Sequence, residues 1–277
     1  MSKEGYLYIT CGGEKYLHEI IESAKSLRRV DNKVHITLII DKEVKEFDGV
    51  IGFEGVGGVE EIKDKVFDTI IVKPYQGNTA KQAYLYKVSH IYTASPYEKT
   101  FYVDTDTYFY EDCGCLFKML EHFDICMAMA PMGGSDFIFE GKNVKAYPNY
   151  NGGVIVFKKN DVNKSLFANW LKIYKQKIAV LPHDQPAFME SLLNSKSRIY
   201  VLSSVWNART PFFLSFPPTT VKIVHGRHKD YEKLRTKLNK VTCHRVWDPQ
   251  KQKCIYQKKG FIRKVGSAIK RRINGFS

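Results

Sequence analysis

The chain has 277 residues, of which 44% are hydrophobic and 26% are charged, and its formal net charge at pH 7 is +14. This composition is typical of a soluble globular protein with one large α/β domain or two small ones. No stretch approaches the roughly 18–20 apolar residues that a membrane-spanning helix needs, which argues against an integral membrane protein.

In the first half of the chain, apolar runs of strand length alternate with stretches of helical spacing. The expected strands are 6–10, 34–40, 68–72 and the run that ends at Val103, and the expected helices are 15–29 and 79–95. This alternation predicts an α/β fold with a mainly parallel central sheet flanked by helices. Ligands of such sheets gather at the carboxyl ends of the strands, where Thr10 and two aspartates lie.

The second half mixes the two kinds of element. Strands are expected at 123–131, 150–159, 198–204 and 220–226, and helices at 162–176 and 185–195. Because no internal repeat or low-complexity linker divides the chain, we expect a single domain over residues 1–250. A short strand directly after the start leaves no signal-peptide pattern, so we expect a cytoplasmic protein, and the six cysteines suit reduced thiols.

The stretch KTFYVDTDTYFYED carries two carboxylates, Asp104 and Asp106, at the end of a buried apolar run. On an extended strand both side chains would face the same way, with Thr105 opposite. Hard oxygen ligands at a strand end suit Mg²⁺ or Mn²⁺ carrying a diphosphate. The alternative is a solvated turn, since a D-x-D pattern arises by chance about once in a chain of this length.

The longer stretch SPYEKTFYVDTDTYFYED resembles the D-x-D strand of the nucleotide-sugar glycosyltransferases with the Rossmann-like type A fold. The resemblance is to glycosyltransferase family 8, which includes glycogenin and bacterial lipopolysaccharide galactosyltransferases. Other segments follow the family's order over residues 6–230, namely ITCGGEKYLHEIIESAKSL, YLYKVSHIY, YNGGVIVF, PHDQPAF, VWNA and IVHG.

The resemblance implies a divalent cation, Mn²⁺ or Mg²⁺, held by Asp104, Asp106 and His225. It also implies two catalytic residues beside the donor sugar, Asp184 and Gln185. The residues that it implies for the nucleotide sugar are Thr10, Tyr16, Lys87, Thr105, Asn151, Gly152, Gly153 and Lys229.

Most of these residues also have a plainer interpretation. Tyr16 could pack its helix instead of stacking a base, and Lys87 could extend to solvent instead of binding a phosphate. Asp184 or Gln185 could cap a helix with Pro186 in its first turn. Asn151 with Gly152 and Gly153 could form an ordinary tight turn.

His225 ends an apolar strand, and a lone histidine is more often structural than a ligand. The family places this histidine farther from the glycine and lysine that follow it than the sequence HGRHKD does. His228 is therefore a rival metal ligand. Either Arg227 or Lys229 takes the phosphate-binding role.

The positive charge is concentrated after residue 250, where nine lysines and arginines and no acidic residue occur. On a helix over 261–276 the apolar residues share one arc and most basic residues lie outside it. Residues 251–277 are therefore predicted to be a basic amphipathic tail that contacts an anionic membrane surface. A solvated helix, or one docked on the body, is the alternative.

These features favour a metal-dependent glycosyltransferase that moves a sugar from a nucleotide sugar, UDP-linked by resemblance, to an acceptor hydroxyl. The resemblance implies retention of anomeric configuration. The expected acceptor is a carbohydrate, glycolipid or lipopolysaccharide-type molecule at the inner face of a membrane, and no nucleic acid is expected as a partner. The alternatives are a sugar nucleotidyltransferase and a non-catalytic basic adaptor that binds membrane or nucleic acid.

Overall fold

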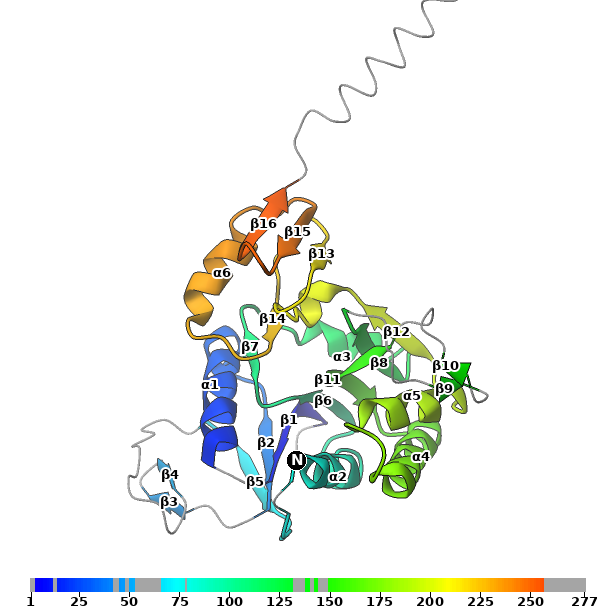
Figure 1. Cartoon of the computed structure of the whole chain (residues 1–277). Helices are drawn as coiled ribbons and strands as arrows, with labels where there is room; N and C mark the ends of the chain where they lie inside the picture. The colour runs from blue at the N-terminus through cyan, green and yellow to red at the C-terminus, as the bar shows by residue number, and fades with distance from the viewer. Residues whose placement is uncertain are drawn as a thin grey trace, which may run out of the picture.

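A seven-stranded sheet lies between two groups of helices (Figure 1). The protein's structure is a computed structural model that describes residues 3–11, 14–41, 45–47, 50–52, 66–77, 79–131, 138–139, 142–143 and 149–256. Within these residues no helix combines the length and the apolar character needed to span a membrane.

The strand order of the central sheet is β12-β8-β11-β6-β1-β2-β5. Its strands are β1 (Glu4–Thr10), β2 (Ile36–Ile40), β5 (Thr69–Val72), β6 (Lys99–Val103), β8 (Ile125–Met129), β11 (Tyr150–Lys158) and β12 (Ile199–Leu202). β11 is antiparallel to both of its neighbours, and the other pairs are parallel. The prediction of a mainly parallel sheet is confirmed.

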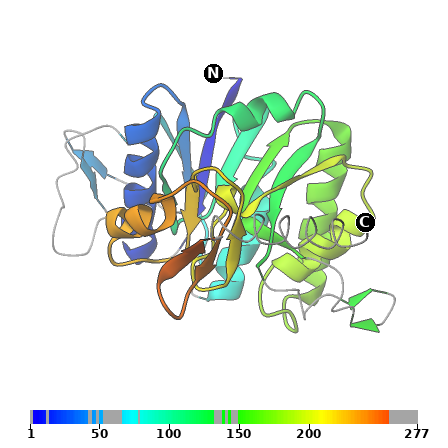
Figure 2. The same ribbon diagram turned by 90° about the horizontal axis from the view of Figure 1, so that it is seen from above.

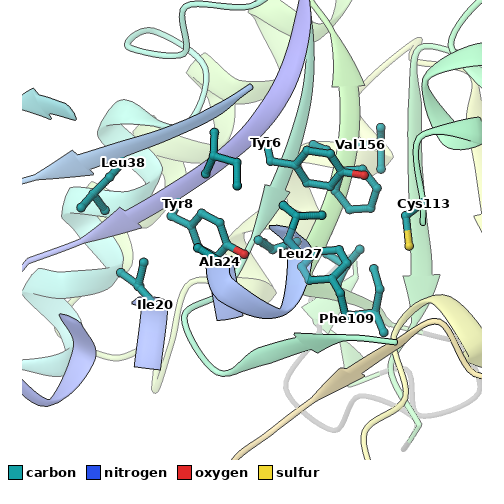
Figure 3. Packing of buried hydrophobic residues seen from close by; sticks show 14 of the residues in the cluster. Tyr6, Tyr8, Ile20, Ala24, Leu27, Leu38, Phe109, Cys113 and Val156 are labelled. Carbon is teal, nitrogen blue, oxygen red and sulfur yellow. The ribbon is translucent and has the colours of Figure 1, made fainter. Parts of the chain in front are cut away.

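Helices cover both faces of the sheet, as its alternating side chains require. On β1, Tyr6 and Tyr8 pack on one face with residues of α1 (Glu14–Val30), as Figure 3 shows, and α3 (Cys115–Met119) belongs to the same cluster. Leu7 and Ile9 pack on the other face. The helices of that second face are α2 (Ala80–His90), α4 (Asp161–Lys177) and α5 (Gln185–Leu193).

A smaller part of the chain lies beside the α1 face of the sheet (Figure 1, Figure 2). Its elements are β7 (Thr107–Phe109), a 3₁₀ turn (Ser204–Trp206), β13 (Leu214–Phe216), β14 (Ile223–His225), α6 (Tyr231–Asn239), β15 (Arg245–Asp248) and β16 (Lys253–Tyr256). A third apolar cluster, which includes the buried Trp247, holds it together. Two short hairpins complete the described elements: β3 (Lys45–Phe47) with β4 (Val50–Gly52), and β9 (Ile138–Phe139) with β10 (Lys142–Asn143).

Two predicted boundaries differ from the structure. The helix predicted over 79–95 ends at His90, because residues 91–94 form turns ahead of Pro96, which disfavours helical geometry in the residue before it. The tail predicted to begin at residue 251 contributes β16, which pairs with β15. The boundary at 250 therefore falls inside a hairpin, and the helix predicted at 261–276 lies outside the described residues.

Asp124 joins three elements at the edge of the sheet opposite the strands' carboxyl ends. Its carboxylate, only 7% exposed, accepts hydrogen bonds from the Arg198 guanidinium at 3.0 and 3.1 Å and lies 3.3 Å from Lys158 Nζ. It also accepts from Asn160 Nδ2, which belongs to the residue that caps α4. Chiefly because of the hydrogen bonds from Arg198, the pKa of Asp124 lies well below its usual range.

We expect Asp124→Asn to lower the free energy of unfolding by about 2–3 kcal/mol at pH 7, because Arg198 and Lys158 would both lose the negative charge with which they pair. A lowered carboxyl pKa stabilises the fold above about pH 4, the unfolded-state value, and this stabilisation is lost as pH falls through the folded-state value. The difference between wild type and variant should therefore shrink below about pH 4. Urea denaturation across pH measures it, with the exposed Asp161→Asn as control; a difference that grows on acidification would contradict the account.

Candidate functional site

A cavity of about 350 Å³ opens at the carboxyl ends of β1 and β6, the edge where ligands were expected. Residues from both helix layers and from the C-terminal part of the chain line it. They are Ile9, Thr10, Cys11, Tyr16, Ala80, Ala83, Tyr84, Tyr86, Lys87, Tyr102, Asp104, Thr105, Asp106, Arg209, His225 and Arg227. Six of the predicted site residues thus meet at one place with His225, which arrives from far along the chain.

The two aspartates do not lie on a strand, and the predicted strand alternation is wrong here. β6 ends at Val103, and Asp104, Thr105 and Asp106 form the turn that leads into β7. The turn is held by two hydrogen bonds to backbone carbonyl oxygens: Asp104 N donates to Gly153 O at 2.8 Å, and the Thr107 side-chain hydroxyl donates to Asp104 O at 2.9 Å. Both carboxylates nevertheless line the cavity, and so does Thr105.

His225 reaches the aspartates through pairing of β14 with β7, in which it stands opposite Thr107. Its Nε2 lies 3.6 Å from Asp104 Oδ2 and 3.4 Å from Asp106 Oδ1. The three residues can each offer one ligand atom within 4.8 Å of the others, the spacing of a metal site. The rival, His228, is instead half-buried, and its Nδ1 accepts from Asp230 N.

The donor set fits a hard divalent cation. Burial alone would raise the pKa of Asp106, but the contact with His225 and the charges of Arg227 and Arg209 lower it to about 2, so the carboxylate is ionised at neutral pH. Tyr102 Oη donates to Asp104 Oδ1 at 2.6 Å and leaves Oδ2 directed toward His225. Two carboxylates and an imidazole are ligands that Mn²⁺ and Mg²⁺ accept.

Gly153 on β11 borders this group more closely than any side chain would allow. A Cβ added to Gly153 would stand 2.0 Å from His225 Cε1 and 2.6 Å from Asp104 Oδ2. A Cβ on the neighbouring Gly152 would meet no atom within 4 Å. Of the two glycines, only Gly153 is required for the approach of the backbone to the site.

Lys87 is buried, so the interpretation in which it extends to solvent is wrong. Its Nζ lies 2.6 Å from Asp184 Oδ2, and both side chains are at most 10% exposed. Burial by itself would lower the pKa of Lys87, but the charges of Asp184 and Asp104 raise it above its usual value. Asp184 is the residue directly before α5, and its side chain makes no capping hydrogen bond, so its carboxylate serves the ion pair and not the helix end.

We expect Lys87→Met to destabilise the protein by about 3–5 kcal/mol, because Asp184 would keep a buried charge without its partner. The double variant Lys87→Met/Asp184→Leu removes both charges and should recover most of that loss. Urea denaturation of the three proteins measures the effect. A double variant no more stable than the single one would show that the pair is not the source of the loss.

At the mouth of the cavity, side chains of α1 contact those of the loop that follows β14. Tyr16 lines it and is 36% exposed, so it is not a helix-packing residue. One helical turn on, Glu19 accepts hydrogen bonds from Arg227 Nε at 2.5 Å and Nη2 at 2.9 Å, and from Thr105 Oγ1 at 3.2 Å. Arg227 therefore reaches the cavity, whereas Lys229 is exposed and is not among the lining residues.

Three further predicted site residues, Asn151, Asp184 and Gln185, do not line the cavity themselves. Asn151 is buried, and its Oδ1 accepts from Gly153 N and from Asn207 Nδ2. Asp184 contacts the cavity through Lys87, and Gln185, the first residue of α5, is not among the lining residues.

Arg209 and Glu19 were not predicted. Arg209 Nη1 lies 3.4 Å from His225 Nε2, and no sequence pattern marks it. Glu19 lies three residues after Tyr16, a spacing that places both on one face of a helix, and this signal could have identified it.

The fold is shared with solved glycosyltransferases. The glycosyltransferase GlyE of Streptococcus pneumoniae TIGR4 matches at 16% identity and a TM-score of 0.54, over 82% of this chain and 56% of that one. Mouse xyloside xylosyltransferase 1 matches at 12% identity and 0.52, over 81% and 98%. An active-site mutant of LgtC matches at 12% identity and 0.51, over 85% and 95%.

These likenesses show that the chain has a type A glycosyltransferase fold, as predicted. The chain spans little more than half the length of GlyE but nearly all of the other two. It matches no protein-family model, and comparison with curated sequences finds no match.

Proposed function

We propose that the protein is a metal-dependent glycosyltransferase that transfers a sugar from a nucleotide sugar, UDP-linked, to an acceptor hydroxyl. The observation that carries the proposal is the convergence of Asp104, Asp106 and His225 in the lining of a cavity in a type A fold. The similar structures are themselves glycosyltransferases, and one is a xylosyltransferase.

Asp104, Asp106 and His225 would hold Mn²⁺ or Mg²⁺, which would supply positive charge beside the diphosphate of the donor. Tyr16 offers an exposed ring face on which a uracil can stack, and Thr10 offers a hydroxyl to its edge. Arg227 can exchange Glu19 for a phosphate oxygen, because it is the exposed partner of their ion pair. We assign the phosphate-binding role to Arg227 in place of Lys229.

The buried Lys87–Asp184 pair favours a positioning role for Asp184. A carboxylate held 2.6 Å from an ammonium group is a weak general base, since removing its charge would leave Lys87 unpaired. We therefore propose retention of anomeric configuration, in which the departing phosphate accepts the acceptor's proton. In this scheme Asp184 and Gln185 position the sugar, Asp184 through its contact with Lys87.

The test is a panel of UDP-sugars incubated with the protein and Mn²⁺, with UDP release as the readout. We expect release from at least one donor, with the reaction abolished by EDTA, and thermal stabilisation by UDP only when Mn²⁺ is present. A protein that is not stabilised by UDP with Mn²⁺ and releases no UDP would contradict the proposal and favour a basic adaptor.

We also propose a cytoplasmic protein whose basic C-terminal residues bring it to the inner face of a membrane and to a glycolipid or lipopolysaccharide-type acceptor. Full-length protein should co-sediment with vesicles that contain anionic lipid more than a variant ending at Tyr256 does. The variant ends there because β16 pairs with the body. Equal co-sedimentation of the two proteins with the vesicles would contradict membrane binding by the C-terminal residues.

A further inference from the structure

A chain of buried hydrogen bonds runs from the backbone of β11 to the imidazole of His225. Asn151, Asn207 and His225 are each at most 7% exposed, so water does not compete for their polar atoms. The first bond has an unambiguous direction, because Gly153 N can only donate: it donates to Asn151 Oδ1 at 3.0 Å. The atom of Asn151 that faces Gly153 is therefore its amide oxygen.

This oxygen determines the orientation of the next amide. The group of Asn207 that lies 2.9 Å from Asn151 Oδ1 must be a donor, so it is the amide nitrogen Nδ2. The other end of the same amide, Asn207 Oδ1, must then face His225, where it lies 2.8 Å from Nδ1. A carbonyl oxygen only accepts, so His225 Nδ1 carries the hydrogen.

The other side of the ring agrees with this assignment. A neutral imidazole with its hydrogen on Nδ1 has a lone pair on Nε2. The guanidinium of Arg209, which can only donate, lies 3.4 Å from Nε2. Nε2 lies 3.6 and 3.4 Å from the nearest oxygens of Asp104 and Asp106, longer than the about 2.7–2.9 Å of a charge-assisted hydrogen bond, so neither carboxylate holds a hydrogen on Nε2.

We propose that Asn207 and Asn151 are positioning residues that fix the Nδ1–H tautomer of His225 and so present the Nε2 lone pair to a cation beside Asp104 and Asp106. This proposal rests on the proposed function for the identity of the ligand, but the tautomer is a property of the metal-free protein. Neither asparagine needs to contact the nucleotide sugar for this role. Partners of this kind orient metal-binding histidines, and their loss typically reduces metal affinity about 10–100-fold.

The test is the ¹⁵N NMR spectrum of the histidine side chains in metal-free protein, at a pH where the rings are neutral. The protein has eight histidines, so the His225 signals are assigned by their absence in His225→Gln. We expect protonated Nδ1 and unprotonated Nε2 in wild type. In Asn207→Leu, which removes the acceptor, a second population with protonated Nε2 should appear.

Asn163→Leu is the matched control, because Asn163 is equally buried and hydrogen-bonded but lies away from the cavity, beside Asp124. It should change stability and leave the His225 signals unchanged. Asn207→Asp keeps an acceptor for Nδ1–H and should retain the wild-type tautomer; if Asn207→Leu does not fold, the wild-type spectrum alone decides the proposal. A wild-type His225 protonated on Nε2, or an Asn207→Leu protein with an unchanged spectrum, would overturn the proposal.

The second readout is binding of Mn²⁺ alone, measured by titration. We expect its dissociation constant to rise at least tenfold in Asn207→Leu and to remain unchanged in Asn163→Leu. A wild type that binds no Mn²⁺ would count against the proposed function, while its NMR spectrum would still decide the tautomer.

Discussion

Asp106→Asn is expected to lower kcat/KM for sugar transfer by about a thousandfold, which corresponds to about 4 kcal/mol of transition-state stabilisation. The variant keeps the size of the side chain and removes the negative charge that faces His225 Nε2 at 3.4 Å. Because the pKa of Asp106 is about 2, the wild-type carboxylate is charged throughout the neutral range. The rate of UDP formation from the donor that the protein uses measures the effect.

The matched control is Asp112→Asn, since Asp112 is an exposed acid in the loop after β7 and its side chain accepts from Gly114 N. This variant should keep wild-type kcat/KM. If the kcat/KM of Asp106→Asn stayed within about threefold of the wild-type value, this would contradict the proposal that the pair of aspartates binds a cation.

Gly153→Ala is expected to reduce activity by about a hundredfold or more, although it adds a single methyl group. The new Cβ would stand 2.0 Å from His225 Cε1 and 2.6 Å from Asp104 Oδ2, so at least one of these proposed ligands must move. Displacement of a reacting group by about 1 Å is enough for a hundredfold loss. Overpacking should also lower the free energy of unfolding by about 1–3 kcal/mol.

Gly152→Ala separates these effects from a general sensitivity of β11. Its Cβ would meet no atom within 4 Å, so activity and stability should stay close to wild type. The comparison uses kcat/KM, urea denaturation and Mn²⁺ titration of both variants. Equal behaviour of the two alanine variants would show that the close approach at Gly153 is not needed for the site.

Most strands of the main sheet were predictable because they fall in apolar runs separated by helices. The runs at 6–10 and 34–40 became β1 and β2, and the 123–131 run contains β8. The elements of the C-terminal part were harder to predict, since β13 and β15 have only three and four residues and are too short for periodicity. Their pairing depends on contacts across long stretches of chain.

The sequence predicted which residues form the candidate site better than it predicted how those residues are arranged. The D-x-D pattern identified Asp104 and Asp106, but their convergence comes from a turn and not from strand alternation. His225 meets them through β14 and β7, which are separated by more than a hundred residues, so spacing alone could not decide between His225 and His228. The Lys87–Asp184 pair arises where α2 packs near α5, and no local pattern predicts such a contact.

The central claim is that Asp104, Asp106 and His225 bind one divalent cation together with a nucleoside diphosphate. Electron paramagnetic resonance of Mn²⁺, titrated into the protein with and without UDP, tests it most directly. We predict that wild type binds one Mn²⁺ per chain more tightly when UDP is present, and that Asp104→Asn/Asp106→Asn loses this binding. Equal Mn²⁺ binding by wild type and the double variant would contradict the claim.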